Sequence, residues 1–240
     1  MRKEKDGLGE RLLPDEAYYG IQTLRAMENF AISDNTFAHY PNIVRAMAEI
    51  KKACALTNKE IGALPADIAD AIATACDEML AGRYPDQFPV NVFRGCGTSI
   101  NMNVNEVLGN RANELLTGHK GADRVHPNTH VNMCQSSNDV FPTAASLVLY
   151  RETGGLLDAL ATLEATVRER MEALGPVVRI GRTCLQDAVP LTFGQSLSGY
   201  ASLLERTRGQ IAAFRKRSAT GILGATAVGT GIGVQPGFMK

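Results

Sequence analysis

The sequence predicts an all-α protein in which a domain of shorter helices is followed by the first part of a bundle of long helices. Beyond residue 40, apolar side chains recur every three or four residues, which is the period of an amphipathic helix. Two of these stretches are unusually long, from Asn138 to Leu174 and from Leu191 to Arg217. No convincing run of alternating apolar and polar residues indicates a strand.

The shorter elements come first. Residues 1 to about 40 are expected to form an arm of irregular or short elements. Pro41 suits the first turn of a helix, where its missing N–H costs nothing. Pro65 can open a second helix, which Gly82 is placed to end. A third helix is expected to stop near Gly118.

The long elements dominate the second part of the chain. Helices of this length exceed the usual three turns and indicate an antiparallel bundle, joined here by a loop over residues 175–190. We therefore expect an N-terminal helical domain over residues 1–137 and an incomplete long-helix bundle over residues 138–240.

Composition narrows the class of protein. The formal net charge is zero, so no basic surface indicates a nucleic acid or an anionic membrane as partner. The longest uncharged run, Gly221 to Phe238, is interrupted by glycines and Pro236, which is unsuited to a membrane span. The five cysteines are odd in number and contain no CxxC pair, which favours reduced thiols in a cytoplasmic protein. No pattern of metal ligands is present, and we expect no metal site.

Three short segments are rich in hydroxyl and amide side chains: Gly97–Asn103, Gln135–Asp139 and Gly181–Asp187. Such residues commonly cap helices, and one residue of the second segment is expected to cap the long helix that follows. The free N–H groups of a helix N-terminus also bind anions, so capping and ligand binding are compatible alternatives.

Taken in order, these segments and others resemble the aspartase/fumarase superfamily over nearly the whole chain. The matching segments are Tyr18–Phe30, Ala75–Leu80, Asp86–Val90, Gly97–Val107, His126–Asn132, Gln135–Asp139, Leu185–Pro190 and Leu223–Gly231. Within the family, Glu28-Asn29-Phe30 and Thr98-Ser99 look more like aspartases than fumarases.

The resemblance implies a lyase that eliminates ammonia from L-aspartate and releases fumarate, without a cofactor. Its partners would be a small dicarboxylate substrate and further copies of the same chain, as a homotetramer. The apolar faces around Leu160, Leu163, Leu204 and Ile211 are expected to drive this association.

The resemblance also implies the substrate-binding positions. Ser136 and Ser137 would hold the carboxylate that takes up charge, Asn138 would help to hold the substrate, and Thr183 would serve its opposite end. The full set of candidates is Thr98, Ser136, Ser137, Asn138, Thr183 and Cys184.

The sequence departs from the family in three places. Cys184 stands where many relatives carry His and some aspartases carry Gln, and a neutral thiol is a poor proton relay. Thr129 replaces an Asp, which weakens the case for a secondary anion site near His126. The family's serine loop, which bears the catalytic base, has no counterpart here, so the base is unknown and we expect the chain to correspond to the first half of a family member. The alternatives are a class II fumarate hydratase or a non-catalytic partial subunit.

Overall fold

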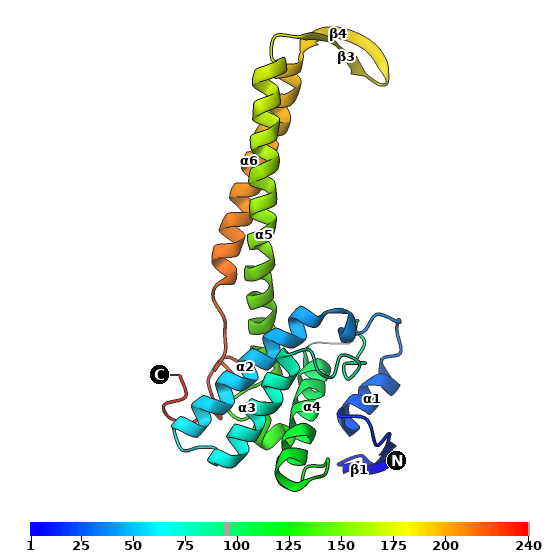
Figure 1. Cartoon of the computed structure of the whole chain (residues 1–240), viewed down its shortest axis with the longest axis vertical. Coiled ribbons are helices and arrows are strands. Elements are labelled where there is room, and N and C mark those ends of the chain that lie inside the picture. The colour runs from blue at the N-terminus through cyan, green and yellow to red at the C-terminus, as the bar shows by residue number, and fades with distance from the viewer. Residues whose placement is uncertain (94–96, 240) are drawn as a thin grey trace. The chain divides into compact units, whose positions relative to one another are not determined.

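The computed structural model describes residues 1–93 and 97–239, and the chain divides into two compact units (Figure 1). One unit contains residues 1–148 and 221–240, and the other contains residues 149–220. The division therefore falls within one long helix, and the last segment of the chain belongs to the first unit. The boundary expected after residue 137 concerns the domains of a whole family member and stays a prediction.

Helices build the core of the first unit. Four of them, α2 (Pro41–Glu60), α3 (Ala66–Leu80), α4 (Thr98–Thr117) and the start of α5 (Ser137–Leu174), contribute buried apolar side chains to one cluster. The expected helix signals are confirmed. Pro41 occupies the first turn of α2, and α4 ends at Gly118, whose left-handed φ of 84° lets its N–H donate to the Glu114 carbonyl.

The N-terminal arm contains a hairpin that the sequence did not predict. Strands β1 (Arg2–Asp6) and β2 (Gly9–Leu13) pair in antiparallel fashion ahead of α1 (Ile21–Asn29) and the short 3-10 helix η1 (Phe37–His39). β1 consists entirely of charged residues, so it shows no apolar alternation. An ion pair between Arg25 and Asp6, at 2.7 Å, helps to hold the hairpin against α1.

A buried carboxylate replaces a conventional cap at the start of α1. Glu106 on α4 accepts hydrogen bonds from the backbone N–H groups of Gly20, Gln22 and Thr23 and from the Thr23 hydroxyl, at 2.7–3.0 Å. Burial raises the pKa of Glu106, while these four donors favour its charged form. These hydrogen bonds tie the N-terminal arm to α4 in the core. The approach is so close that a side chain at Gly20 would overlap the Glu106 carboxyl group.

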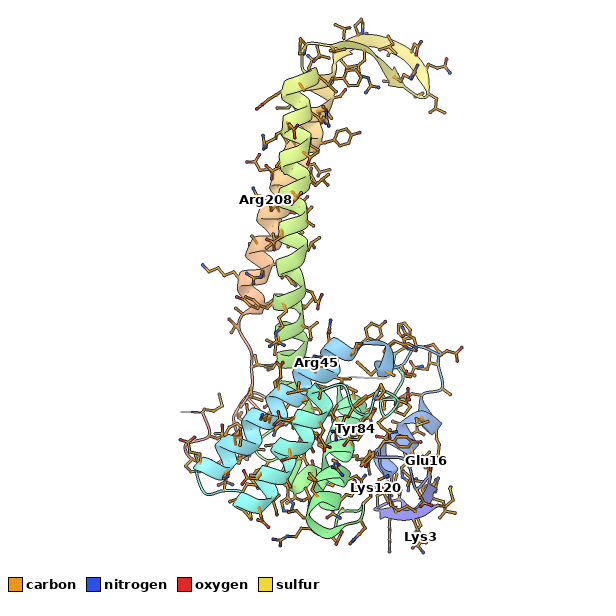
Figure 2. The ribbon with its side chains drawn as sticks, viewed as in Figure 1. Lys3, Glu16, Arg45, Tyr84, Lys120 and Arg208 are labelled. Atoms are coloured by element: carbon orange, nitrogen blue, oxygen red, sulfur yellow. The ribbon has the colours of Figure 1, made fainter. Side chains whose placement is uncertain are left out.

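The second unit is an antiparallel pair formed by the rest of α5 and by α6 (Phe193–Ser218), as predicted (Figure 1). The antiparallel pairing is shown by contacts in which residues later in α5 meet residues earlier in α6. Arg208, labelled in Figure 2, donates to Glu164 at 2.9 Å, and Arg168 donates to Glu205 at 3.0 Å. Further along, Arg215 donates to the carbonyl of Tyr150 at 3.0 Å.

The connection between these helices is a second hairpin, so the loop expected over residues 175–190 was wrong in part. Strands β3 (Val178–Thr183) and β4 (Gln186–Thr192) pair across a loop made of Cys184 and Leu185. Both loop residues have positive φ, 48° and 63°, a conformation for which Asn-Gly is the usual sequence signal. The missing signal explains the wrong prediction.

The segment over residues 221–239 contains no helix or strand and is held against the first unit by side chains near the start of α5. Asp139 accepts from the N–H groups of Gly224 and Thr226, at 3.2 and 2.8 Å, and Thr143 accepts from that of Ile222. Within the described residues, no helix is long and apolar enough to cross a membrane.

Candidate active site at two helix N-termini

The start of α5 is built by reciprocal capping. The Ser136 hydroxyl accepts from the Asn138 N–H at 3.2 Å, and Asp139 accepts from the Ser136 N–H at 2.9 Å. Ser136 is thus the capping residue that was expected in the Gln135–Asp139 segment. Because Asp139 also binds the last segment of the chain, one fully buried carboxylate fixes both Ser136 and residues 224–226.

The start of α4 lies beside the start of α5. Asn101 donates to the Ser137 hydroxyl oxygen at 3.0 Å, and Gly97 approaches Phe141 so closely that an added Cβ would lie 2.5 Å from the Phe141 Cβ. Thr98 is the first residue of α4, and no described side chain caps that N-terminus. Two helix N-termini, each a positive dipole end, therefore adjoin. The first N–H groups of α4 lack a described side-chain cap, whereas at α5 the Asn138 N–H is already bound by Ser136.

A cavity of about 490 Å³ opens at this place. Its size is within the range of small-molecule sites. Ser137 and Asn138 line it together with Gly97, and the remaining described walls are apolar: Phe37, Val92, Phe141 and Pro142. Since Ser137 already accepts a bond from Asn101, its hydroxyl proton is left to donate to another acceptor. The described lining carries no charged side chain, so the cavity offers neutral donors to an anion.

Not all candidate residues belong to this unit. Ser136, Ser137 and Asn138 stand at the start of α5 and Thr98 at the start of α4, and of these four only Ser137 and Asn138 line the cavity. The Asn138 amide donates to the carbonyl of Ala227 at 2.8 Å. Thr183 and Cys184 belong to the second unit and are exposed on its hairpin. There, an ion pair between Arg182 and Asp187, at 2.9 Å, braces the turn that presents them.

Polar residues behind the cavity were not singled out from the sequence. Lys51 on α2 is fully buried and donates to the side-chain oxygens of Asn132 and Gln135, at 2.8 and 2.9 Å. Asn101 donates to the same Asn132 oxygen at 3.1 Å. The signal was present, because Lys51 stands four residues after Met47 on the buried stripe of its helix.

His126 lies elsewhere, in the wall of a separate cavity of about 670 Å³ that Lys120, labelled in Figure 2, also lines. The His126 Nδ1 accepts from the N–H groups of Asn128 and Thr129, at 3.2 and 3.1 Å. In the described part of the chain, no group of three or more acidic, His or Cys side chains is arranged to hold a metal ion.

Comparisons with known proteins agree on one family. A family model described as lyase matches residues 9–240. The chain is 44% identical to an aspartate ammonia-lyase of Bacillus subtilis and 47% identical to a class II fumarate hydratase of Halobacterium salinarum. These matches cover 100% and 99% of the chain and 50% of each relative. The chain thus spans about half the length of the curated relatives it matches.

Solved structures give the same result. The cobalt-bound fumarate lyase:delta crystallin from Brucella melitensis superimposes with a TM-score of 0.89 at 44% identity, covering 99% of this chain and 52% of that one. A class II fumarase from Schistosoma mansoni superimposes with a TM-score of 0.89 at 41% identity, covering 99% of this chain and 50% of that one.

Proposed function

Because the chain belongs to the aspartase/fumarase superfamily of lyases, we propose that it forms the part of a lyase active site that binds a carboxylate of a small dicarboxylate. The observation that supports this most is the pair of adjoining helix N-termini at a cavity lined by Ser137, whose described lining carries no charged side chain. Such donors suit an anion of small size.

In the proposed reaction, a base removes a proton from the carbon next to this carboxylate, which then carries a second negative charge. The Ser137 hydroxyl and the free N–H groups at the start of α4 stabilise that charge, because they are aimed before it develops. Asp139 holds Ser136 and Asn138 in place by fixing the first turn of α5. Thr183 and Cys184 serve the other end of the substrate in an assembly of several copies.

For the substrate we propose L-aspartate, with ammonia as the leaving group and fumarate as product. The aspartase-like words at Glu28–Phe30 and Thr98-Ser99 support this choice. Relatives named for each activity match with similar identity, so malate is the alternative substrate and fumarate hydratase the alternative activity.

The test is the absorbance of fumarate when the longest polypeptide encoded by the source gene is given L-aspartate or L-malate. We expect turnover of aspartate, and a loss of about 100-fold to 1000-fold in kcat for Ser137→Ala, the usual effect of removing one such donor. Thr74→Ala, which removes an exposed helical hydroxyl, is the matched control and should keep full activity. Turnover of malate alone would reassign the enzyme as a hydratase, and turnover of neither would reject the proposal. Residues 1–240 by themselves are expected to be inactive.

We also propose that the second unit associates with other copies of the chain as a homotetramer. Leu163 is exposed as expected, whereas Leu160, Leu204 and Ile211 are half-buried. Other exposed apolar side chains support the same surface: Leu149, Leu156, Tyr200 and Leu203. A monodisperse monomer by light scattering would contradict this assembly.

A further inference from the structure

Lys51 occupies a position that is costly for a lysine. Its side chain is fully buried, and the two acceptors of its ammonium group are amide oxygens rather than a carboxylate. Burying a charge without a close opposite charge costs free energy, and an apolar residue of similar length would avoid that cost. A buried lysine without a carboxylate partner breaks the usual pairing of buried charges, and such exceptions are expected mainly at functional sites.

The contacts of Lys51 lead to the candidate site. Asn132 accepts at one oxygen atom from both Lys51 and Asn101, at 2.8 and 3.1 Å. Asn101 donates from the same nitrogen to the Ser137 hydroxyl, at 3.0 Å. Gln135, the other partner of Lys51, begins the segment that contains the candidate serines. The lysine is thus two amide side chains away from the hydroxyl that faces the cavity.

Each link restricts the orientation of the next group. Lys51 fixes the Asn132 oxygen towards the interior, which turns the Asn101 nitrogen to that oxygen and to Ser137. Ser137 then receives a bond at its oxygen, so its proton is directed away from Asn101. Without Lys51, Asn132 loses one of the two donors at its oxygen. Its amide is then held only by Asn101 and by its own bond to the Gln135 carbonyl, at 3.2 Å, so its orientation is fixed less firmly.

We propose that Lys51 is a positioning residue of the lyase site, which acts through Asn132 and Asn101 to orient the Ser137 hydroxyl towards the bound carboxylate. The inference rests on the proposed function for the identity of the ligand. Lys51 does not line the cavity, so the role proposed for it is to position Ser137 and not to bind the substrate.

The groups around Lys51 leave its hydrogen bonds intact whether or not it is protonated. Burial lowers the pKa of Lys51 to about 7, while the carboxylate of Asp139 acts in the opposite direction at longer range. The thiols that also face Lys51 remain neutral, because burial raises the pKa of Cys54 to about 12 and that of Cys76 further. The hydrogen bonds to Asn132 and Gln135 need only two N–H groups, so either protonation state of Lys51 can make them.

The experiment is a double-mutant cycle of Lys51→Met and Ser137→Ala in the longest polypeptide encoded by the gene. We expect Lys51→Met alone to lower kcat by up to about 100-fold, with a smaller change in KM, because it misplaces a transition-state donor. In the Ser137→Ala background, the same change should alter kcat by no more than about twofold. An equal loss in both backgrounds would overturn the proposal.

Lys52→Met is the matched control, because Lys52 is the next residue on α2 and forms a surface ion pair with Asp77. It should leave kcat unchanged. If Lys51→Met does not fold, Asn132→Ala replaces it in the cycle, since it removes the acceptor that Lys51 and Asn101 share; additivity with Ser137→Ala would again refute the proposal.

Hydrogen exchange separates this inference from the proposed function. Amides of Gln135–Asp139 should exchange faster in Lys51→Met than in the unmodified chain, and at the normal rate in Lys52→Met. If no lyase turnover is found but exchange is faster in Lys51→Met, the proposed function fails, whereas the inference that Lys51 positions the Gln135–Asp139 segment stands. Unchanged exchange in Lys51→Met would overturn the positioning role itself.

Discussion

Asp139→Asn tests how the candidate site is held together, because Asp139 accepts hydrogen bonds both from the start of α5 and from the last segment of the chain. Its Oδ1 accepts from the Ser136 N–H at 2.9 Å. Its Oδ2 accepts from the N–H groups of Gly224 and Thr226, at 3.2 and 2.8 Å. Asparagine has the same shape but only one oxygen, so its NH2 group must face at least one of these donors.

The magnitude follows from the number of bonds affected. If the amide oxygen faces Gly224 and Thr226, the bond from the Ser136 N–H is lost, at about 2 kcal/mol for a charge-assisted bond. The two remaining bonds lose their charged acceptor, at about 1 kcal/mol each. We therefore expect the free energy of unfolding to fall by about 4 kcal/mol.

Urea unfolding measures this loss, and hydrogen exchange of residues 221–239 locates it. Exchange should accelerate in that segment and at the start of α5. The control is Asp70→Asn, which removes an exposed carboxylate paired with Lys59 and should change stability little. A loss under about 1 kcal/mol for Asp139→Asn, with normal exchange in the segment, would show that Asp139 does not hold it.

Three further predictions concern close packing and buried charge. Gly97→Ala places a Cβ 2.5 Å from a side-chain carbon of α5, and should destabilise the chain by about 1–3 kcal/mol and raise KM for the dicarboxylate, as measured by urea unfolding and steady-state kinetics. Gly20→Ala brings a Cβ to 2.8 Å from the Glu106 carboxyl group and should lower the melting temperature, whereas Gly7→Ala meets no atom within 4 Å and should not. The native pKa of Lys51, about 7, lies below its value in the unfolded chain, so the unfolded state holds the extra proton above pH 7. Compared with Lys51→Met, the unmodified chain should gain stability from pH 7 towards 10, by up to about 1.4 kcal/mol per pH unit in urea titrations, and a flat difference would contradict a buried lysine with a lowered pKa.

The helices could be predicted because their signals are local. Pro41 and Gly118 restrict the backbone at their own positions, and the apolar period of α5 and α6 persists over many turns. The β3–β4 hairpin could not, because its turn is made of Cys184 and Leu185 rather than Asn-Gly. Pairing with the opposite strand stabilises that turn, and this information lies outside the turn sequence.

In the candidate site, too, the residues with a local signal could be predicted and those with distant partners could not. The Gln135–Asp139 segment was found because its hydroxyl and amide groups stand at a helix start. The role of Asp139 was missed, because two of its donors, Gly224 and Thr226, lie more than 80 residues away in the sequence. Lys51 was missed because a lysine on the apolar face of a helix is usually assumed to lie at the edge of that face, with its charged end in water.

The distribution of charge explains why the proposed site should act on the rate more than on binding. Lys51 and Asp139, which are hydrogen-bonded to Gln135 and Ser136, are fully buried and do not line the cavity, and the described cavity wall carries no charged side chain. A lysine in that wall would attract the dicarboxylate before and during the reaction alike, which lowers KM without raising kcat. Fixed hydroxyl and N–H dipoles gain most when a second charge develops on the same carboxylate, because they need no reorientation at that moment. Removal of Lys51 should therefore reduce kcat through the orientation of Ser137, and a change confined to KM would mean that the lysine serves only to attract the substrate.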